Sequence, residues 1–185
     1  MSVAEHRDLL LARLRVTLPL VLERYRAVTG RDVADSPDPV LYAAGPPPLT
    51  SASGYPAVYV TPLELLGLRR SETPGEWTAR YRFEVIVYVR GNDLRHAQVV
   101  RDALGTALRA ALLDGTRLGE RVALVPVSLT ERYSAIESVA GGTLAGVGAQ
   151  LELVAEEAAF PPLPLGRAET IDLTLRSTPV PQPIE

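Results

Sequence analysis

The sequence contains no cysteine and no lysine, so all 19 of its basic residues are arginine. The first absence excludes disulfides, thiolate metal ligands and cysteine nucleophiles. The second excludes a phosphate-binding loop of the Gly-Lys-Ser or Gly-Lys-Thr type. Histidine is scarce as well: with only His6 and His96, a transition-metal site would have to rely on carboxylates. We therefore expect no metal site and no cofactor.

Long apolar runs are also missing. No stretch approaches the roughly 18 apolar residues that a membrane-spanning helix needs, and Glu5 and Asp8 stand where a signal peptide would be basic and then apolar. The net charge of −3 gives no general attraction to phosphate, so duplex binding would need a local basic patch. These features predict a soluble protein made inside the cell, with no membrane contact and no sequence-specific nucleic-acid binding.

Proline is abundant but unevenly placed. Of the 16 prolines, only Pro126 lies between Gly75 and Phe160. Because proline interrupts helices and central strands, most of the regular structure should lie in that stretch. We predict a single domain over residues 1–160 that includes a proline-rich loop at residues 31–54. An extended proline-rich arm at residues 161–185 should follow it.

Two helices are predicted from apolar residues spaced three and four apart. The row in the first helix consists of Leu11, Leu14, Leu18, Val21, Tyr25 and Val28. Gly30 should end this helix, and Pro19 should kink it or divide it in two. The row in the second helix consists of Leu94, Ala97, Val100, Leu104, Leu108 and Leu112. Asn92 or Asp93 can cap its start.

Strands are predicted where apolar and polar residues alternate. The clearest strand covers residues 77–90, with its apolar face at the odd positions. Residues 55–61, 121–130 and 143–155 predict further strands, residues 63–70 fit a turn or a strand, and residues 131–142 predict a turn. The predicted fold class is α+β, in the order α-β-β-α-β-β. A mostly antiparallel sheet of four to five strands should carry two main helices on one face.

No catalytic constellation emerges from the motifs. The glycines at positions 141, 142, 146 and 148 lack the spacing of a dinucleotide-binding loop and lead into a strand rather than a helix. They favour a turn where another backbone packs closely. To act as a base, His96 would need a partner in a pocket. A histidine that packs on the surface of its helix is the simpler interpretation.

Three arginines, Arg80, Arg82 and Arg90, project from the polar face of the long strand. A nucleic-acid-binding sheet would place several exposed aromatic side chains among them, whereas Tyr88 is the only clear one. Ion pairs with Glu152 or Glu131, across strands or between subunits, are the favoured interpretation.

The order of elements resembles a known family. The run YRFEVIVYVRG at residues 81–91 is followed by a helix ending in LRAALL, by Leu118-Gly119, by the turn Glu131-Arg132-Tyr133 and by the strand at residues 143–154. This pattern, over residues 55–156, resembles the tail terminator (tail completion) proteins of actinobacterial long-tailed phages and tailocins. It is more distantly similar to the lambdoid terminator fold. The loop at residues 31–54 and the tail after Phe160 are longer than in the compact members.

The resemblance implies a structural protein rather than an enzyme. Its copies would form a closed ring, typically a hexamer, that caps the tail tube, ends its polymerisation and joins the tail to the head or neck. The partners would be other copies of the chain, the tail tube protein, the sheath of a contractile particle and the head–tail connector or neck protein. DNA would pass through the ring. The protein would lie in the host cytoplasm during assembly and in the neck of the mature virion or injection particle.

Two alternatives remain open at this point. One is another neck or baseplate adaptor; the other is a small-molecule-binding or enzymatic α+β domain. As a tail terminator or as a neck or baseplate adaptor, the protein should contact a neighbour through its arm. The reason is that a stiff proline spacer precedes a segment at residues 170–176 in which apolar and polar residues alternate. Folding back onto its own sheet, or disorder, is the alternative for the arm. The predicted subunit or ring interface consists of Arg80, Arg82, Tyr133, Ile171, Leu173 and Leu175.

Overall fold

The computed structural model describes residues 2–45, 54–70, 76–91, 93–134, 137–139 and 142–158. Within these residues the chain forms two helices and a seven-stranded sheet, which confirms the α+β class. The predicted arm, with Ile171, Leu173 and Leu175, lies outside the described residues.

The first helix, α1, spans Val3–Thr29 without interruption. Ser2 and Glu5 form a capping box at its start, and Gly30 ends it in a left-handed conformation with φ of 67°. Pro19 lies inside the helix, so the predicted division into two helices is wrong. Leucines on both sides of Pro19, at positions 18 and 22, are fully buried, and this packing holds the two halves in one helix.

The face of α1 that packs on the sheet begins earlier than predicted. Leu11, Leu14 and Leu18 are buried as expected, but Val28 is 81% exposed. At the other end His6 is completely buried, with its ring centroid 5.3 Å from that of Tyr81. The N-terminal half of α1 therefore provides most of its contact with the core.

The second helix, α2, spans Leu94–Leu113. Asp93 caps it by accepting a hydrogen bond of 2.8 Å from the His96 amide. The predicted apolar row is buried from Ala97 to Leu112, and only Leu94 at its start is exposed. Its contacts are mainly with the centre of the sheet, and it also packs against α1.

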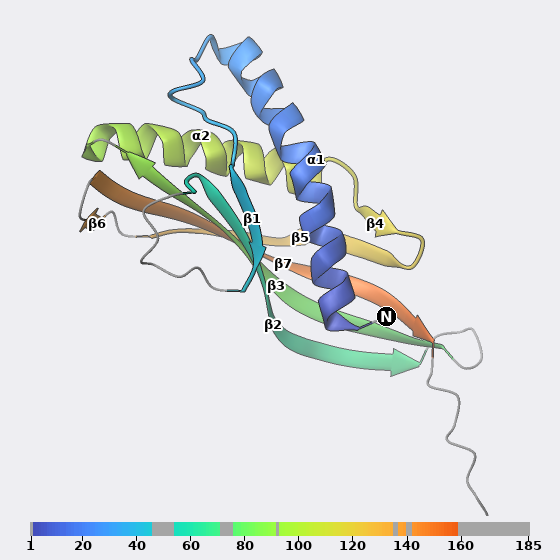
Figure 1. Ribbon diagram of the computed structural model, residues 1–185. Helices are drawn as coiled ribbons and strands as arrows, with labels where there is room; N and C mark the ends of the chain where they lie inside the picture. Colours follow the sequence, from blue (N-terminus) through green and yellow to red (C-terminus); the bar gives the residue numbers. More distant parts are fainter. Residues whose placement is uncertain are drawn as a thin grey trace, which may run out of the picture.

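The strands are β1 (Leu41–Ala44), β2 (Ala57–Arg70), β3 (Glu76–Gly91), β4 (Arg117–Gly119), β5 (Val122–Tyr133), β6 (Glu137–Val139) and β7 (Gly142–Ala158). Their order across the sheet is β1-β2-β3-β7-β5-β4, with β6 beside β7 (Figure 1). The β1–β2 pair is parallel and the other pairs are antiparallel.

The sheet is larger than the four to five strands predicted. The predicted loop at residues 31–54 contains β1, and the predicted turn at residues 131–142 contains the end of β5 and all of β6. Residues 63–70 continue β2. β1 and β6 are too short for their sequences to show the two-residue alternation of a strand. They form strands because each pairs with a longer neighbour. Pro126 coincides with a register shift of β5 against β7, between Val125 and Thr130, as its position predicted.

Both helices pack on one face of the sheet (Figure 1). This face carries the odd residues of β3, and from Ala79 to Val89 they are all buried. Phe83, at 0% exposure, is the largest fully buried side chain of the core. The even residues of β3 lie on the opposite face, which no helix covers, and they are exposed or half-buried.

Candidate functional site

Arg80 and Arg82 lie on the face of the sheet that the helices leave open. Arg80 pairs with Glu152 of β7, and Arg82 pairs with Glu64 of β2 and approaches Glu152 at 3.8 Å. The register places these residues side by side across three strands. The prediction of a cross-strand pair with Glu152 is therefore confirmed. The four side chains form an alternating row of charges in which each charge faces its opposite.

Glu131 pairs elsewhere. It lies opposite Ala149, on the helix-covered face, and accepts two hydrogen bonds of 2.5 and 2.7 Å from Arg109 of α2. Within one subunit, the predicted alternative pairing of the strand arginines with Glu131 is wrong, because Glu131 and those arginines project from opposite faces of the sheet. The hydroxyl of Tyr133 donates a third hydrogen bond to Glu131, at 3.2 Å.

The electrostatics of this second cluster follow from these contacts. Hydrogen bonds from Arg109 hold the pKa of Glu131 below its ordinary value, and the same bonds raise the pKa of Arg109. Burial raises the pKa of the Tyr133 hydroxyl, and the charge of Glu131 adds to this effect. The guanidinium of Arg101 lies 5.0 Å from the centre of the Tyr133 ring, a cation–π contact. The cluster joins α2 to the end of β5.

The described members of the predicted interface therefore do not form one patch. Tyr133 is opposite Val147 of β7, whereas Arg80 is opposite Val154, and the two side chains project from opposite faces. The two positions along β7 are separated by about 23 Å, at roughly 3.3 Å per residue. The structure brings together Arg80 and Arg82 but leaves Tyr133 in a separate cluster.

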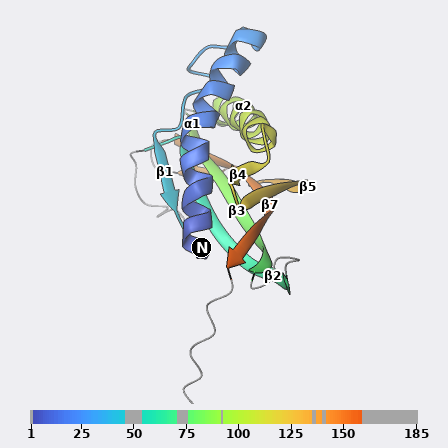
Figure 2. The same ribbon diagram turned by 90° about the vertical axis from the view of Figure 1, so that its right-hand side faces the viewer.

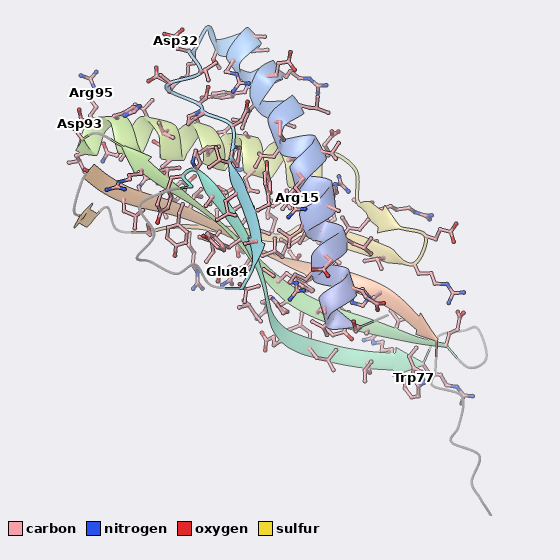
Figure 3. All side chains as sticks on the ribbon, in the orientation of Figure 1. Arg15, Asp32, Trp77, Glu84, Asp93 and Arg95 are labelled. Atoms are coloured by element: carbon pink, nitrogen blue, oxygen red, sulfur yellow. The ribbon has the colours of Figure 1, made fainter. Side chains whose placement is uncertain are left out.

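An apolar patch, which we define as Leu65, Leu68 and Trp77, lies at the far end of the sheet. These side chains are between 42% and 53% exposed. Leu65 and Leu68 are opposite Tyr81 and Ala79, so they lie on the helix-covered side of the sheet, as does Trp77. Figure 3 places Trp77 at the end of the molecule away from Asp93 and Arg95.

The apolar patch is exposed because the helices stop short of it. α1 begins at Val3, and the ends of β2 and β7 extend past its N-terminal end in both views (Figure 1, Figure 2). His6 covers Tyr81, which is 7% exposed, but Trp77 is 42% exposed. The apolar face of the sheet thus continues beyond its helical cover. Large exposed apolar groups gathered in this way are typical of interaction sites.

The sheet also has two open edges. β1 pairs with β2 only at Ala57–Val60, and β4 pairs with β5 only near Val122 and Ala123. Beyond these points, among the described residues, no strand lies outside β2 or outside β5. Both strands therefore present backbone N–H and C=O groups that a further strand could pair with.

The remaining polar groups support the fold. A shallow hollow at the C-terminal end of α2 contains Arg13, which donates hydrogen bonds to the carbonyl oxygens of Asp114 and, at 3.0 Å, Arg117. His96 lies with Nε2 at 3.2 Å from the carbonyl oxygen of Ala34.

Across the described part of the chain, no three His, Asp or Glu residues are grouped as a metal site would need, and no helix is long and apolar enough to cross a membrane.

The comparisons with known proteins add little. No protein-family model and no curated protein matches the chain. Among solved structures it is similar to a chain of "Virion of native gene transfer agent (GTA) particle", with 15% sequence identity and a TM-score of 0.31. The match covers 78% of this chain and 95% of the other. A TM-score this low does not establish a shared fold.

Proposed function

We propose that the protein is a structural subunit of a phage-like tail. Its copies form a closed ring, typically a hexamer, that caps the tail tube, ends its growth and joins the tail to the head or neck. The observation that carries this proposal is the pair of open edges on opposite sides of one sheet. Contacts between unlike surfaces of successive copies generate a ring when the rotation closes. The sequence resemblance to tail terminators supports a ring at the tail tube in particular.

The charged clusters support a structural rather than an enzymatic role. Arg80, Arg82, Glu64 and Glu152 neutralise one another, and Arg109 is bound to Glu131 by two hydrogen bonds. Side chains held in this way fix strands and helices in place. Leu65, Leu68 and Trp77 instead leave apolar surface exposed at the far end of the sheet, and exposed apolar groups are typical of the core of protein interfaces.

Two measurements test the proposal. Light scattering and negative-stain imaging of the full chain should show a closed ring, and the ring should limit the length of tubes assembled from the tube protein of the same particle. Leu68→Arg should weaken the ring, whereas the control Val28→Arg, at an exposed apolar residue of α1, should not. A ring that leaves tube length unchanged would favour a neck or baseplate adaptor, and a stable monomer would contradict both roles.

A further inference from the structure

The outer edge of β2 is open beyond Val60. β3 pairs with β2 along almost its whole length, up to Arg70, but β1 covers the other side of β2 only as far as Val60. The uncovered part includes two leucines of the apolar patch, at positions 65 and 68, each at least 50% exposed. A strand added at this edge would gain backbone hydrogen bonds and apolar contacts together.

The properties of such a strand follow from the edge. Leu65 and Leu68 both lie on the helix-covered side of the sheet. The added strand should therefore carry apolar residues at alternate positions, on that same side, and polar residues at the positions between. Residues 170–176 of this chain have this pattern, with Ile171, Leu173 and Leu175 alternating with Thr170, Asp172, Thr174 and Arg176.

The described part of the chain ends at the same end of the sheet as the open part of the β2 edge. Ala158, the last residue of β7, is opposite Glu76, the first residue of β3, at the end of the sheet that carries Trp77. Residues 159–169 could span at most about 36 Å when fully extended. A segment at residues 170–176 can therefore reach a β2 edge near this end of the sheet.

The prolines of the spacer favour an edge on another copy. Residues 160–164 are either proline or precede proline, and residues of this kind disfavour the helical conformations that would help the chain to reverse toward its own sheet.

We propose that residues 170–176 of one copy add as a strand to the outer edge of β2 in a second copy. Ile171, Leu173 and Leu175 then pack beside Leu65 and Leu68 of the receiving copy and cover part of the apolar patch. Each copy holds one neighbour and is held by another. The inference rests on the proposed function, because it requires that several copies assemble.

Disulfide trapping tests this exchange, and the absence of native cysteine means that every disulfide must involve introduced residues. Full-length copies carrying Leu65→Cys are co-expressed with differently tagged copies carrying Ile171→Cys, Leu173→Cys or Leu175→Cys. After oxidation, a non-reducing gel should show a disulfide-linked dimer of the two tagged chains for at least one of the three pairs. Val28→Cys in place of Leu65→Cys is the matched control and should give no such dimer, because Val28 lies in α1 near its C-terminal end.

Two results would overturn the inference. One is failure of all three pairs to form the mixed dimer. The other is an intrachain disulfide in the double variant Leu65→Cys/Leu173→Cys without any mixed dimer, which would show that the segment folds back on its own β2. Light scattering of the unmodified protein distinguishes failure of the arm exchange from failure of the proposed function. An assembled protein without the mixed dimer contradicts only the arm exchange, whereas a monomer contradicts the proposed function as well.

Discussion

At the scale of single residues, Val85 and its neighbour Ile86 show how the strand period separates core from surface. Val85 is completely buried, so Val85→Asp should place an unpaired charge in the core and prevent stable folding. Ile86 projects from the open face, where a charge remains in contact with water. Ile86→Lys is therefore the control and should fold. Circular dichroism and thermal unfolding compare the two variants, and a normally folded Val85→Asp protein would mean that the faces are exchanged.

A second residue-scale prediction concerns Glu131. Its pKa is lowered in the folded protein by Arg109, so the pair adds stability above the ordinary glutamate pKa. This contribution is lost as the pH falls below the ordinary glutamate pKa and through the lowered pKa of Glu131. Glu131→Gln should reduce the free energy of unfolding at pH 7 by up to about 1 kcal/mol, because solvent screens the half-exposed Arg109.

Urea unfolding at neutral and acidic pH measures this effect. The difference between the wild-type protein and Glu131→Gln should shrink on acidification, while the control Glu23→Gln, on the exposed side of α1, should differ little from the wild type at either pH. A difference that grows at low pH would contradict the assigned direction of the pKa shift.

Among single residues, the sequence predicts those whose neighbours repeat a pattern and misses those that depend on distant contacts. The buried face of β3 and the Arg80–Glu152 pair follow from alternation and strand pairing. His6 does not: the apolar row predicted for the first helix begins at Leu11, yet His6 is fully buried against Tyr81. Only the crossing of α1 over β3 brings the two rings together.

At the scale of elements, the junction between β3 and α2 depends on Gly91. A Cβ at this position would lie 2.5 Å from the amide nitrogen of Ala97 and 2.7 Å from its Cα, inside the first turn of α2. Gly91→Ala should therefore displace the start of the helix and destabilise the protein by about 1–3 kcal/mol. At Gly67 of β2 the same substitution meets no atom within 4 Å. Gly67→Ala is the control in thermal unfolding, and equal melting of both variants would contradict the close approach.

Long elements were predictable and short ones were not. α2, β3 and β7 each show several repeats of their period, and their buried faces match the expectation. β1 has only four residues, in a region rich in proline and glycine, so its local sequence indicates a loop. It forms a strand because residues 57–60 of β2 offer a partner.

At the scale of the whole molecule, the exposure of the apolar patch could not be predicted from the alternation of apolar and polar residues. Alternation correctly places Trp77 on the same face as Phe83, but Phe83 is fully buried and Trp77 is 42% exposed. The difference arises from where α1 begins relative to the end of the sheet, which depends on how the elements pack. The sequence therefore predicts the apolar face, and the structure is needed to show that part of it is left uncovered.

The last prediction concerns removal of the arm. Deleting residues 161–185 should leave a folded protein with nearly unchanged thermal unfolding, because the buried residues of β7, up to Ala155, lie before the deletion. Sedimentation should show a weaker or incomplete ring, since each copy would lose the segment proposed to bind its neighbour. Replacing Ile171, Leu173 and Leu175 by serine in the full chain is the matched variant and should have the same effect on assembly. A truncated protein that unfolds, beside a full-length protein that is a stable monomer, would show that the segment belongs to its own core.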